Sequence, residues 1–383
     1  MVTALLRCFR MWIDRNASRR SDIAYVAQSL RRLRFPVASL VNSPPATYGN
    51  HVAGLFSHSQ DQESDLSKGV VMSSALWQSG AVVIGCRENT AEFIEKLLSS
   101  HCPVAGVVTI SQATADRNQV PSWIDLSLEF GEHISVYTSQ SYKLETPADI
   151  EILGATKADV GFCIGWQRLL PQWFLSLHRN GVFGMHACAN RLPNGRGRSP
   201  INWSVIEGAS RLHAHIFRYN DEPDAGDLLS VPIIPIEPHD DIQTLQQKAR
   251  VVFNSEVIRR WQELLSDTVA LQPLNSSGEP ERFYPKRSEH DGLIDWTWSA
   301  QQITNWVRAQ THPYPGAFTF LDNQRYSIWR CGPTGLELIA QTGTIVESFR
   351  DGTCFVACDQ NQSVHLLQHD LPLPLKPGTR LGL

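Results

Sequence analysis

The sequence lacks any long run of uncharged apolar residues. Its richest apolar stretch, around residues 160–185, is interrupted by Gln167, Arg168, His178 and Arg179. A helix that crosses a membrane needs about 20 consecutive, predominantly apolar residues. The sequence therefore predicts a protein without a membrane span.

Cysteine is also scarce, with 8 residues among 383, and none of them forms a C-x-x-C pair. The closest two, Cys354 and Cys358, have no second pair of ligands nearby. This usage argues against a disulfide framework and favours buried, reduced thiols. We therefore predict a reducing, cytoplasmic location and no bound metal.

The chain has no excess of positive charge, since 34 Lys and Arg residues stand against 38 Asp and Glu. A net charge of −4 provides no chain-wide basic field for binding a phosphate backbone. Only residues 1–35 are basic, with eight arginines against Asp14 and Asp22. Arginine-rich starts are typical of transit peptides, but the two early acids weaken that interpretation.

The N-terminal region shows no clear periodicity. Residues 36–68 are rich in Ser, Gln, His and Pro, which favours a loop or disorder. We predict residues 1–75 to be an unassigned N-terminal extension. An alternative is that translation starts later, near Met72, so that the first 70 residues belong to no domain.

A regular alternation of elements follows. Two apolar runs of strand length, Ala81–Gly85 and Val104–Ile110, flank a stretch with helical spacing. Strand, helix and strand within 30 residues predict a βαβ unit and an open, mostly parallel α/β sheet. A further strand is expected at Val160–Trp166. Because functional loops lie at the carboxyl ends of such strands, Gly165–Pro171 is a candidate binding segment. The first turn lacks G-x-G-x-x-G, so dinucleotide binding is not supported.

The densest group of chemically active residues lies at residues 184–203. It combines His186 with three arginines, prolines and glycines that cannot form regular structure throughout. The pattern after it predicts a helix that begins at Pro200, with Ser199 as its N-cap. Cys188 has no second histidine as partner and is not predicted to be a nucleophile.

An acidic turn at residues 219–227 lies between two predicted strands, His213–Arg218 and Leu229–Ile236. A carboxylate from this turn can orient the His186 imidazole and stabilise its charged form. A lone histidine is more often structural than catalytic, and the spacing alone is a weak signal.

At these residues the sequence resembles a known family. The run H-x(5)-L-P-x-x-R-G-R-S-P-I-N-W from His186, followed by P-D-A-G-D at 223–227, is similar to the 10-formyltetrahydrofolate-dependent formyltransferases. That family includes methionyl-tRNA formyltransferase and sugar N-formyltransferases. A second match, D-G-L-I-D-W at 291–296, R-A at 308–309 and P-Y-P-G-A-F at 313–318, resembles the start of the family's C-terminal domain.

The resemblance implies a Rossmann-like formyltransferase fold followed by a small OB-like β-barrel. We expect the catalytic domain at residues 76–272 and the barrel at residues 273–383. The barrel agrees with evenly spaced β-prone runs after a predicted helix at Ser299–Gln310. These runs are Ala317–Leu321, Tyr326–Trp329, Leu336–Ile339, Thr344–Phe349, Cys354–Ala357 and Val364–Leu367.

The resemblance also implies roles for individual residues. The family's catalytic histidine and aspartate fall on His186 and Asp224, and its co-substrate is 10-formyltetrahydrofolate. The folate pocket would be formed, largely through backbone groups, by Gln167, Arg168, Leu169, Leu170, Pro171 and Asp221.

Two residues are candidates for binding the amine substrate, Arg198 and Asn202. A guanidinium group matches a phosphate in a bidentate manner, so Arg198 is suited to a phosphorylated substrate. An equally good interpretation is that Arg198 ties down its own loop. For Arg196, between two glycines, the structural role is favoured.

One departure from the family pattern concerns the oxyanion. The family's usual asparagine, two residues before the histidine, is Gly184 here. The amide that would polarise the formyl oxygen is therefore missing, and Asn190 or Asn202 is a candidate replacement. A catalytically impaired relative, or one that hydrolyses the folate, is an alternative interpretation.

Charge bears on the substrate as well. Residues 282–383 carry nine Lys and Arg against nine Asp and Glu, whereas a tRNA-binding domain is expected to be basic. The segment from His186 to Leu192 is also two residues longer than in the tRNA enzymes. We therefore predict transfer of a formyl group to the primary amine of a nucleotide-linked amino sugar or similar small metabolite. The alternative is methionyl-tRNA, and a homodimer is one expectation for the assembly.

Overall fold

The computed structural model describes residues 76–274 and 281–382. The predicted N-terminal extension, residues 1–75, lies outside the described residues. No helix within the described ranges is long and apolar enough to cross a membrane.

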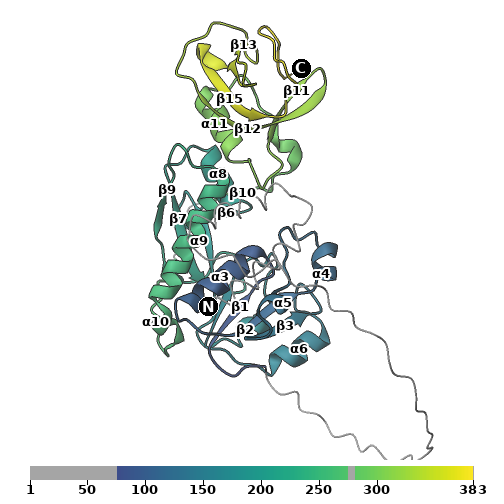
Figure 1. Ribbon diagram of the computed structural model, residues 1–383. Coiled ribbons are helices and arrows are strands. Elements are labelled where there is room, and N and C mark those ends of the chain that lie inside the picture. Colours follow the sequence, from purple (N-terminus) through teal and green to yellow (C-terminus); the bar gives the residue numbers. More distant parts are fainter. Residues whose placement is uncertain (1–75, 275–280, 383) are drawn as a thin grey trace, which may run out of the picture. The chain divides into compact units, whose positions relative to one another are not determined.

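The large sheet of the described chain has eight strands in the order β3-β2-β1-β4-β5-β7-β8, and β9 also pairs with β7 (Figure 1). Strands β3, β2, β1, β4 and β5 are parallel neighbours, whereas β7 runs antiparallel to β5, β8 and β9. The strands are β1 (Ala81–Ile84), β2 (Val104–Ile110), β3 (Ser135–Ser139), β4 (Val160–Cys163), β5 (Val182–Cys188), β7 (Arg211–Arg218), β8 (Leu228–Ser230) and β9 (Ile233–Pro235). The predicted mostly parallel sheet is confirmed.

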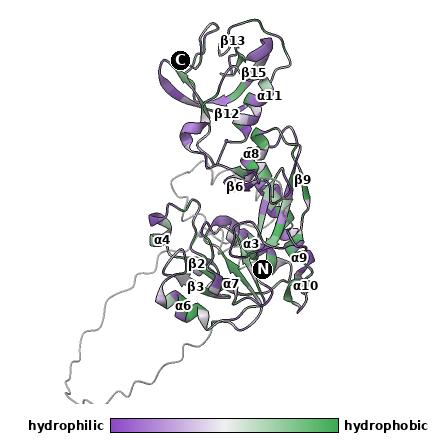
Figure 2. Ribbon diagram, turned by 180° about the vertical axis from the view of Figure 1, so that it is seen from behind, coloured by the Kyte–Doolittle hydropathy of each residue, from purple (hydrophilic) through white to green (hydrophobic). Residues whose placement is uncertain are grey.

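Helices cover both faces of this sheet. They are α3 (Glu88–Ser99), α4 (Gln112–Arg117), α5 (Leu126–Phe130), α6 (Pro147–Gly154), α7 (Gln172–Leu175), α8 (Pro200–Ile206), α9 (Ile242–Arg259) and α10 (Trp261–Leu265). The predicted βαβ unit therefore exists as β1, α3 and β2. Helix α9 carries hydrophobic and hydrophilic residues together, as a helix lying on a sheet must (Figure 2).

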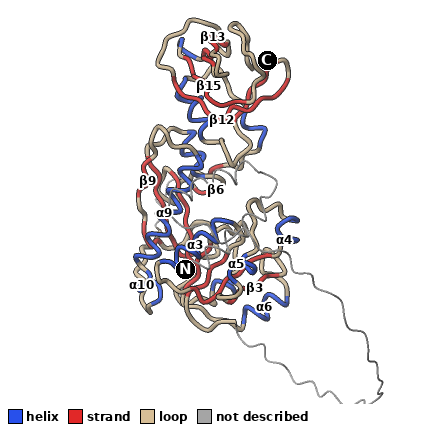
Figure 3. Tube along the Cα trace, in the orientation of Figure 1, coloured by secondary structure: helices blue, strands red, loops and turns tan. Residues whose placement is uncertain are grey.

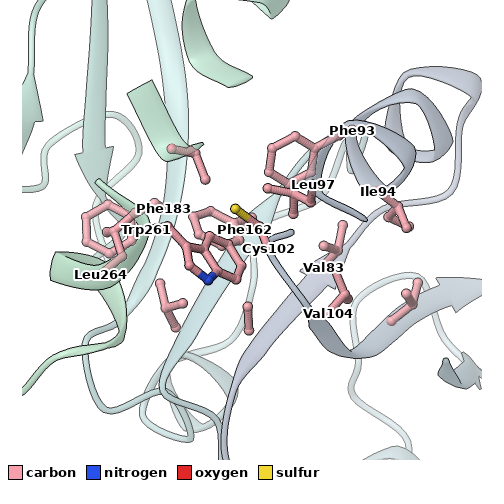
Figure 4. Close-up of a cluster of buried hydrophobic side chains, with 14 of the residues drawn as sticks. Val83, Phe93, Ile94, Leu97, Cys102, Val104, Phe162, Phe183, Trp261 and Leu264 are labelled. Atoms are coloured by element: carbon pink, nitrogen blue, oxygen red, sulfur yellow. The ribbon is translucent and has the colours of Figure 1, made fainter. Parts of the chain in front are cut away.

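Successive side chains of β1 point to opposite faces of the sheet, so the strand contributes to a hydrophobic core on each face. On one face Val83 contacts a cluster that includes Phe93 and Leu97 of α3, Phe162 of β4 and Trp261 of α10 (Figure 4).

On the other face, Val82 and Ile84 belong to a second cluster with Leu153 of α6 and Phe174 of α7. Because β2 and β4 lie on opposite sides of β1, the strand order reverses there. A crevice at the carboxyl ends of the strands is the usual ligand site of such a sheet.

Two expectations in this region are wrong. The predicted strand Leu229–Ile236 is divided into β8 and β9, because Pro232 has no N–H to donate to a strand ladder. Ser199 precedes α8 but makes no side-chain cap hydrogen bond. Its backbone is left-handed (φ 52°), whereas a capping side chain requires an extended residue.

The C-terminal region forms a separate five-stranded antiparallel sheet in the order β11-β12-β15-β14-β13. Figure 3 shows α11, at the place labelled in Figure 1, as a blue helix beside the strands of this region. Ser299 caps α11 by accepting a hydrogen bond from Gln302 N, and Ile303 and Val307 enter the core. The elements are β11 (Ala317–Leu321), β12 (Gln324–Pro333), β13 (Ile345–Ser348), β14 (Cys354–Ala357), β15 (Ser363–His369), α11 (Ala300–Arg308), and the short helices η1 (Glu289–Gly292) and η2 (Asp359–Asn361).

One predicted strand of this region is absent. Leu336–Ile339 forms no strand, and Ile339 is 91% exposed. Gly335 adopts φ 73° directly after β12, which ends the extended run. The fold class, an α/β domain followed by a small β domain, is nonetheless confirmed, while the boundaries at 76–272 and 273–383 stay a prediction.

Candidate active site

His186 lies in β5, between the parallel part of the sheet and β7. It is paired across the antiparallel ladder with His215, and both side chains point to the same face. The His186 side chain is only 6% exposed. A buried imidazole must satisfy both ring nitrogens, so its partners define its protonation state.

Both nitrogens of His186 meet oxygen acceptors. Nδ1 lies 3.3 Å from Asp224 Oδ2, and Nε2 lies 2.8 Å from the carbonyl oxygen of Gly195. A carbonyl oxygen can only accept, so Nε2 carries a proton. Burial by itself lowers the pKa of His186, but the contacts with Asp224 and Cys188 outweigh it and raise the pKa to about 10. His186 is therefore an imidazolium ion at neutral pH.

His215 has the opposite character. Its Nε2 accepts a hydrogen bond from Leu192 N at 3.1 Å, so Nδ1 is the nitrogen that donates to the carbonyl of His186, also at 3.1 Å. Burial, followed by the nearby positive charges, lowers the pKa of His215 to about 4. His215 is thus a neutral residue that orders the backbone of β5 and the loop after it.

Asp224 reaches His186 from the turn between β7 and β8. Its backbone is left-handed (φ 55°), a conformation that aspartate tolerates better than most residues. Its side chain is 29% exposed, so the carboxylate contacts both the buried histidine and solvent. The predicted pairing of His186 with Asp224 is present in the structure.

Arg196 joins the two loops that supply the partners of His186. It lies in β6 (Arg196–Gly197), which pairs with β10 (Phe283–Tyr284). Its Nη1 contacts Glu222, two residues before Asp224 in the chain, at 2.9 Å, and Glu281 at 3.1 Å. With the arginine 6% exposed, this is the structural role favoured for it from the sequence.

Replacement of Arg196 by alanine should lower the free energy of unfolding by about 2 kcal/mol, because two carboxylates lose their charged hydrogen bonds. Chemical denaturation measures this directly. Arg198, two residues on and exposed, is the matched control, since alanine there should change stability by less than about 0.5 kcal/mol. Equal effects of the two substitutions would contradict the bridging role of Arg196.

The predicted folate segment follows β4. Gln167, Arg168 and Leu169 are exposed, and Leu170 is buried. The Gln167 N–H donates to the hydroxyl of Tyr142 at 2.9 Å, which fixes the turn.

This segment contains one unused donor. Trp166 Nε1 is buried and has no hydrogen-bond partner within the described chain. An unsatisfied buried donor is costly, which fits a segment completed by a polar ligand. Pro171 is the N-cap of α7, and Asp221 is exposed in the turn before Asp224.

The two predicted substrate residues have partners other than the His186–Asp224 pair. No hydrogen bond or ion pair among the described residues joins Arg198 or Asn202 to His186 or Asp224. Arg198 is exposed and its N–H donates to Tyr284 O. Asn202 is 4% exposed and donates to Ala309 O at 2.7 Å. Their substrate roles stay predictions.

The two asparagines considered as replacements for the missing amide have other partners. Asn190 Nδ2 donates to the hydroxyl of Tyr284 at 3.2 Å, and Asn202 Nδ2 is held by Ala309 O. One residue near the site was not indicated by the sequence. It is Tyr219, whose hydroxyl lies directly against Gly184. Within the described ranges, no group of His, Cys, Asp or Glu is arranged to hold a metal ion.

Comparisons with known proteins agree with this arrangement of fold and site. The chain matches the family described as formyl transferase over residues 80–260 and the formyl transferase C-terminal domain over residues 286–372. Together the two matches span most of the chain. The protein therefore belongs to the formyl transferase family and is a formyltransferase.

The chain is similar to a curated methionyl-tRNA formyltransferase in sequence and to two solved structures in fold. The methionyl-tRNA formyltransferase of Geotalea uraniireducens is 28% identical over 72% of this chain and 86% of its own. An N-formyltransferase from Helicobacter canadensis, solved with folinic acid and dTDP-3-aminofucose, matches 76% of this chain and 99% of its own with a TM-score of 0.53 at 15% identity. A HypX variant from Aquifex aeolicus matches at 14% identity with a TM-score of 0.52, and this chain spans 44% of it.

Proposed function

We propose that the protein transfers the formyl group of 10-formyltetrahydrofolate to the primary amine of a nucleotide-linked amino sugar or similar small metabolite. The observation that carries the proposal is the contact between the buried His186 and the Asp224 carboxylate within the segment that matches the formyl transferase family. The N-formyltransferase from Helicobacter canadensis, solved with folinic acid and dTDP-3-aminofucose, supports both substrate classes.

The chemistry follows from the protonation states of the pair. The neutral amine attacks the formyl carbon, and the carbonyl electron pair moves onto oxygen. The Asp224 carboxylate, 29% exposed beside His186, accepts the proton that the amine loses. The imidazolium of His186 orients the Asp224 carboxylate through Nδ1, and its positive charge offsets the negative charge that develops nearby. The tetrahedral intermediate then collapses, and the folate nitrogen leaves with the proton that Asp224 took from the amine.

A small amine is favoured over tRNA by the C-terminal region. Residues 282–383 have equal numbers of basic and acidic residues, so the domain has no net positive charge to hold an RNA backbone. Methionyl-tRNA is the second candidate, because the Geotalea uraniireducens relative that covers 72% of this chain carries that activity in its name.

A substrate panel tests the proposal. Consumption of 10-formyltetrahydrofolate is followed with nucleotide-linked amino sugars, with methionyl-tRNA and with water alone. We expect consumption that depends on an amino sugar, with a formylated sugar as product. A higher kcat/KM with methionyl-tRNA would transfer the assignment to the second candidate. Consumption without any amine would identify a hydrolase instead.

A further inference from the structure

Tyr219 is placed beside the catalytic pair by the register of two strands. It follows β7, and its N–H donates to the carbonyl of Val182 at 2.7 Å. In the β5–β7 ladder Gly184 lies opposite Phe217 and Phe183 opposite Arg218, so Tyr219 lies opposite Val182, two residues along β5 from Gly184. Residues two apart on a strand share a face. The Tyr219 side chain therefore lies on the same face as Gly184 and His186.

The hydroxyl of Tyr219 occupies the place of a side chain at residue 184. A Cβ atom built on Gly184 would lie 2.1 Å from the Tyr219 hydroxyl oxygen and 2.5 Å from ring atoms Cε1 and Cζ. No side chain fits there while Tyr219 keeps its position. The Tyr219 phenol therefore takes the space that a side chain at residue 184, two positions before His186, would otherwise fill.

The surroundings of Tyr219 connect it to the predicted folate segment. The ring contacts the cluster that contains Trp166 and Leu170 on this face of the sheet. Asp224 is also close enough for its charge to act on the Tyr219 hydroxyl. The phenol therefore lies among the residues that would hold the formyl donor and the residues that would receive the proton.

The Tyr219 hydroxyl keeps its proton and is free to donate a hydrogen bond to a stronger acceptor. Burial, and then the nearby Cys163 and Asp224, raise the pKa of Tyr219 well above its ordinary value. The Cys163 thiol acts on this hydroxyl, and burial raises the pKa of that thiol to about 12, so it stays a neutral and weak acceptor. An oxyanion is a far stronger acceptor than a thiol. By contrast, both N–H groups of His186 already meet oxygen acceptors, Asp224 and the Gly195 carbonyl.

We propose that the Tyr219 hydroxyl, seated over Gly184, donates the hydrogen bond that stabilises the oxyanion of the tetrahedral intermediate. This inference rests on the proposed formyl transfer. As the amine–carbon bond forms, the carbonyl electron pair moves to oxygen and the Tyr219 O–H donates to it without giving up its proton. The pair returns when the bond from carbon to the folate nitrogen breaks, and that nitrogen takes the proton lost by the amine. The structure thereby supplies the donor that Gly184 lacks.

The first test is Tyr219→Phe, which removes only the hydroxyl. We expect kcat to fall by about 10²- to 10³-fold, the usual loss for one oxyanion donor, while KM for both substrates changes less than about threefold. Tyr137→Phe is the matched control, because it removes a hydroxyl bonded to Asp149 at 2.9 Å on strand β3. The control should keep wild-type kcat.

The second test moves the hydrogen-bond donor from residue 219 to residue 184. Gly184→Asn alone should lose most activity, because its side chain cannot fit beside Tyr219. In the double variant with Tyr219→Ala, the asparagine side chain has room and supplies an amide donor to the site. We therefore expect kcat of the double variant to be at least tenfold above that of Tyr219→Ala alone. Circular dichroism and thermal unfolding establish that each variant is folded.

The outcomes separate this inference from the proposed function. A Tyr219→Phe variant with wild-type kcat, beside an active wild type, overturns the role of Tyr219 and leaves formyl transfer intact. A wild type that neither transfers the formyl group to any amine nor releases it to water overturns both. A loss in Tyr219→Phe that appears in KM instead of kcat also overturns the oxyanion role, since it would indicate ground-state binding.

Discussion

Replacement of Asp224 by asparagine should reduce kcat for formyl transfer by about 10³-fold, within the range typical of general acid–base groups. The amide preserves the size of the side chain but cannot take a proton from the amine. It also removes the charge that keeps His186 protonated, since the contact of Asp224 Oδ2 with Nδ1 at 3.3 Å is the main opponent of burial. The pKa of His186 should therefore fall from about 10 to below its ordinary value.

Two measurements check this expectation. Steady-state kinetics give the loss in kcat, and an NMR titration of the His186 ring gives the change in pKa. Asp227→Asn is the matched control, because Asp227 lies in the same turn but forms an exposed ion pair with Arg218 at 2.9 Å. Exposed pairs contribute little, so this variant should stay within about twofold of wild type. Equal losses in the two variants would show that the turn, and not the Asp224 carboxylate, is what matters.

The parallel sheet was predictable because its signals are local. Each strand of the βαβ unit is a short apolar run, and α3 repeats its buried residues at helical spacing. The same reasoning failed at Leu336–Ile339, where apolar residues follow a left-handed glycine and remain exposed. Composition suggests a strand there, but only the ladder partners of β12 and β15 decide which residues pair.

The candidate site was predictable in part. The resemblance to the formyltransferases indicated His186 and Asp224, and the structure brings the two side chains into contact. Nothing in the sequence indicated that Tyr219 would lie over Gly184, because that contact depends on the register of β5 against β7. The sequence also did not indicate that the Gly195 carbonyl would accept a hydrogen bond from His186 Nε2. Every residue has a carbonyl group, and only the conformation of the loop directs this one toward the histidine.

His186→Gln should abolish most activity, with kcat lower by about 10³- to 10⁴-fold, and it should change how stability depends on pH. In the folded chain the pKa of His186 is about 10, above its ordinary value of 6.5. The folded state thus binds a proton that the unfolded state releases between these values. The resulting stabilisation is complete below pH 6.5 and is lost as the pH rises toward 10, with a slope of at most about 1.4 kcal/mol per pH unit. Glutamine has no proton to contribute, so this part of the slope should disappear.

Denaturation at several pH values between 6.5 and 10 measures this, as the difference in unfolding free energy between wild type and variant. The difference should be largest near pH 6.5 and shrink as the pH rises. His215→Gln is the matched control on the paired strand, because its pKa of about 4 leaves it neutral throughout this interval. That variant should lose stability by a constant amount at every pH, since it removes hydrogen bonds to Leu192 N and His186 O without removing a charge. A constant difference for His186→Gln as well would mean that His186 is neutral in the folded protein, and the imidazolium at the centre of the proposed mechanism would have to be abandoned.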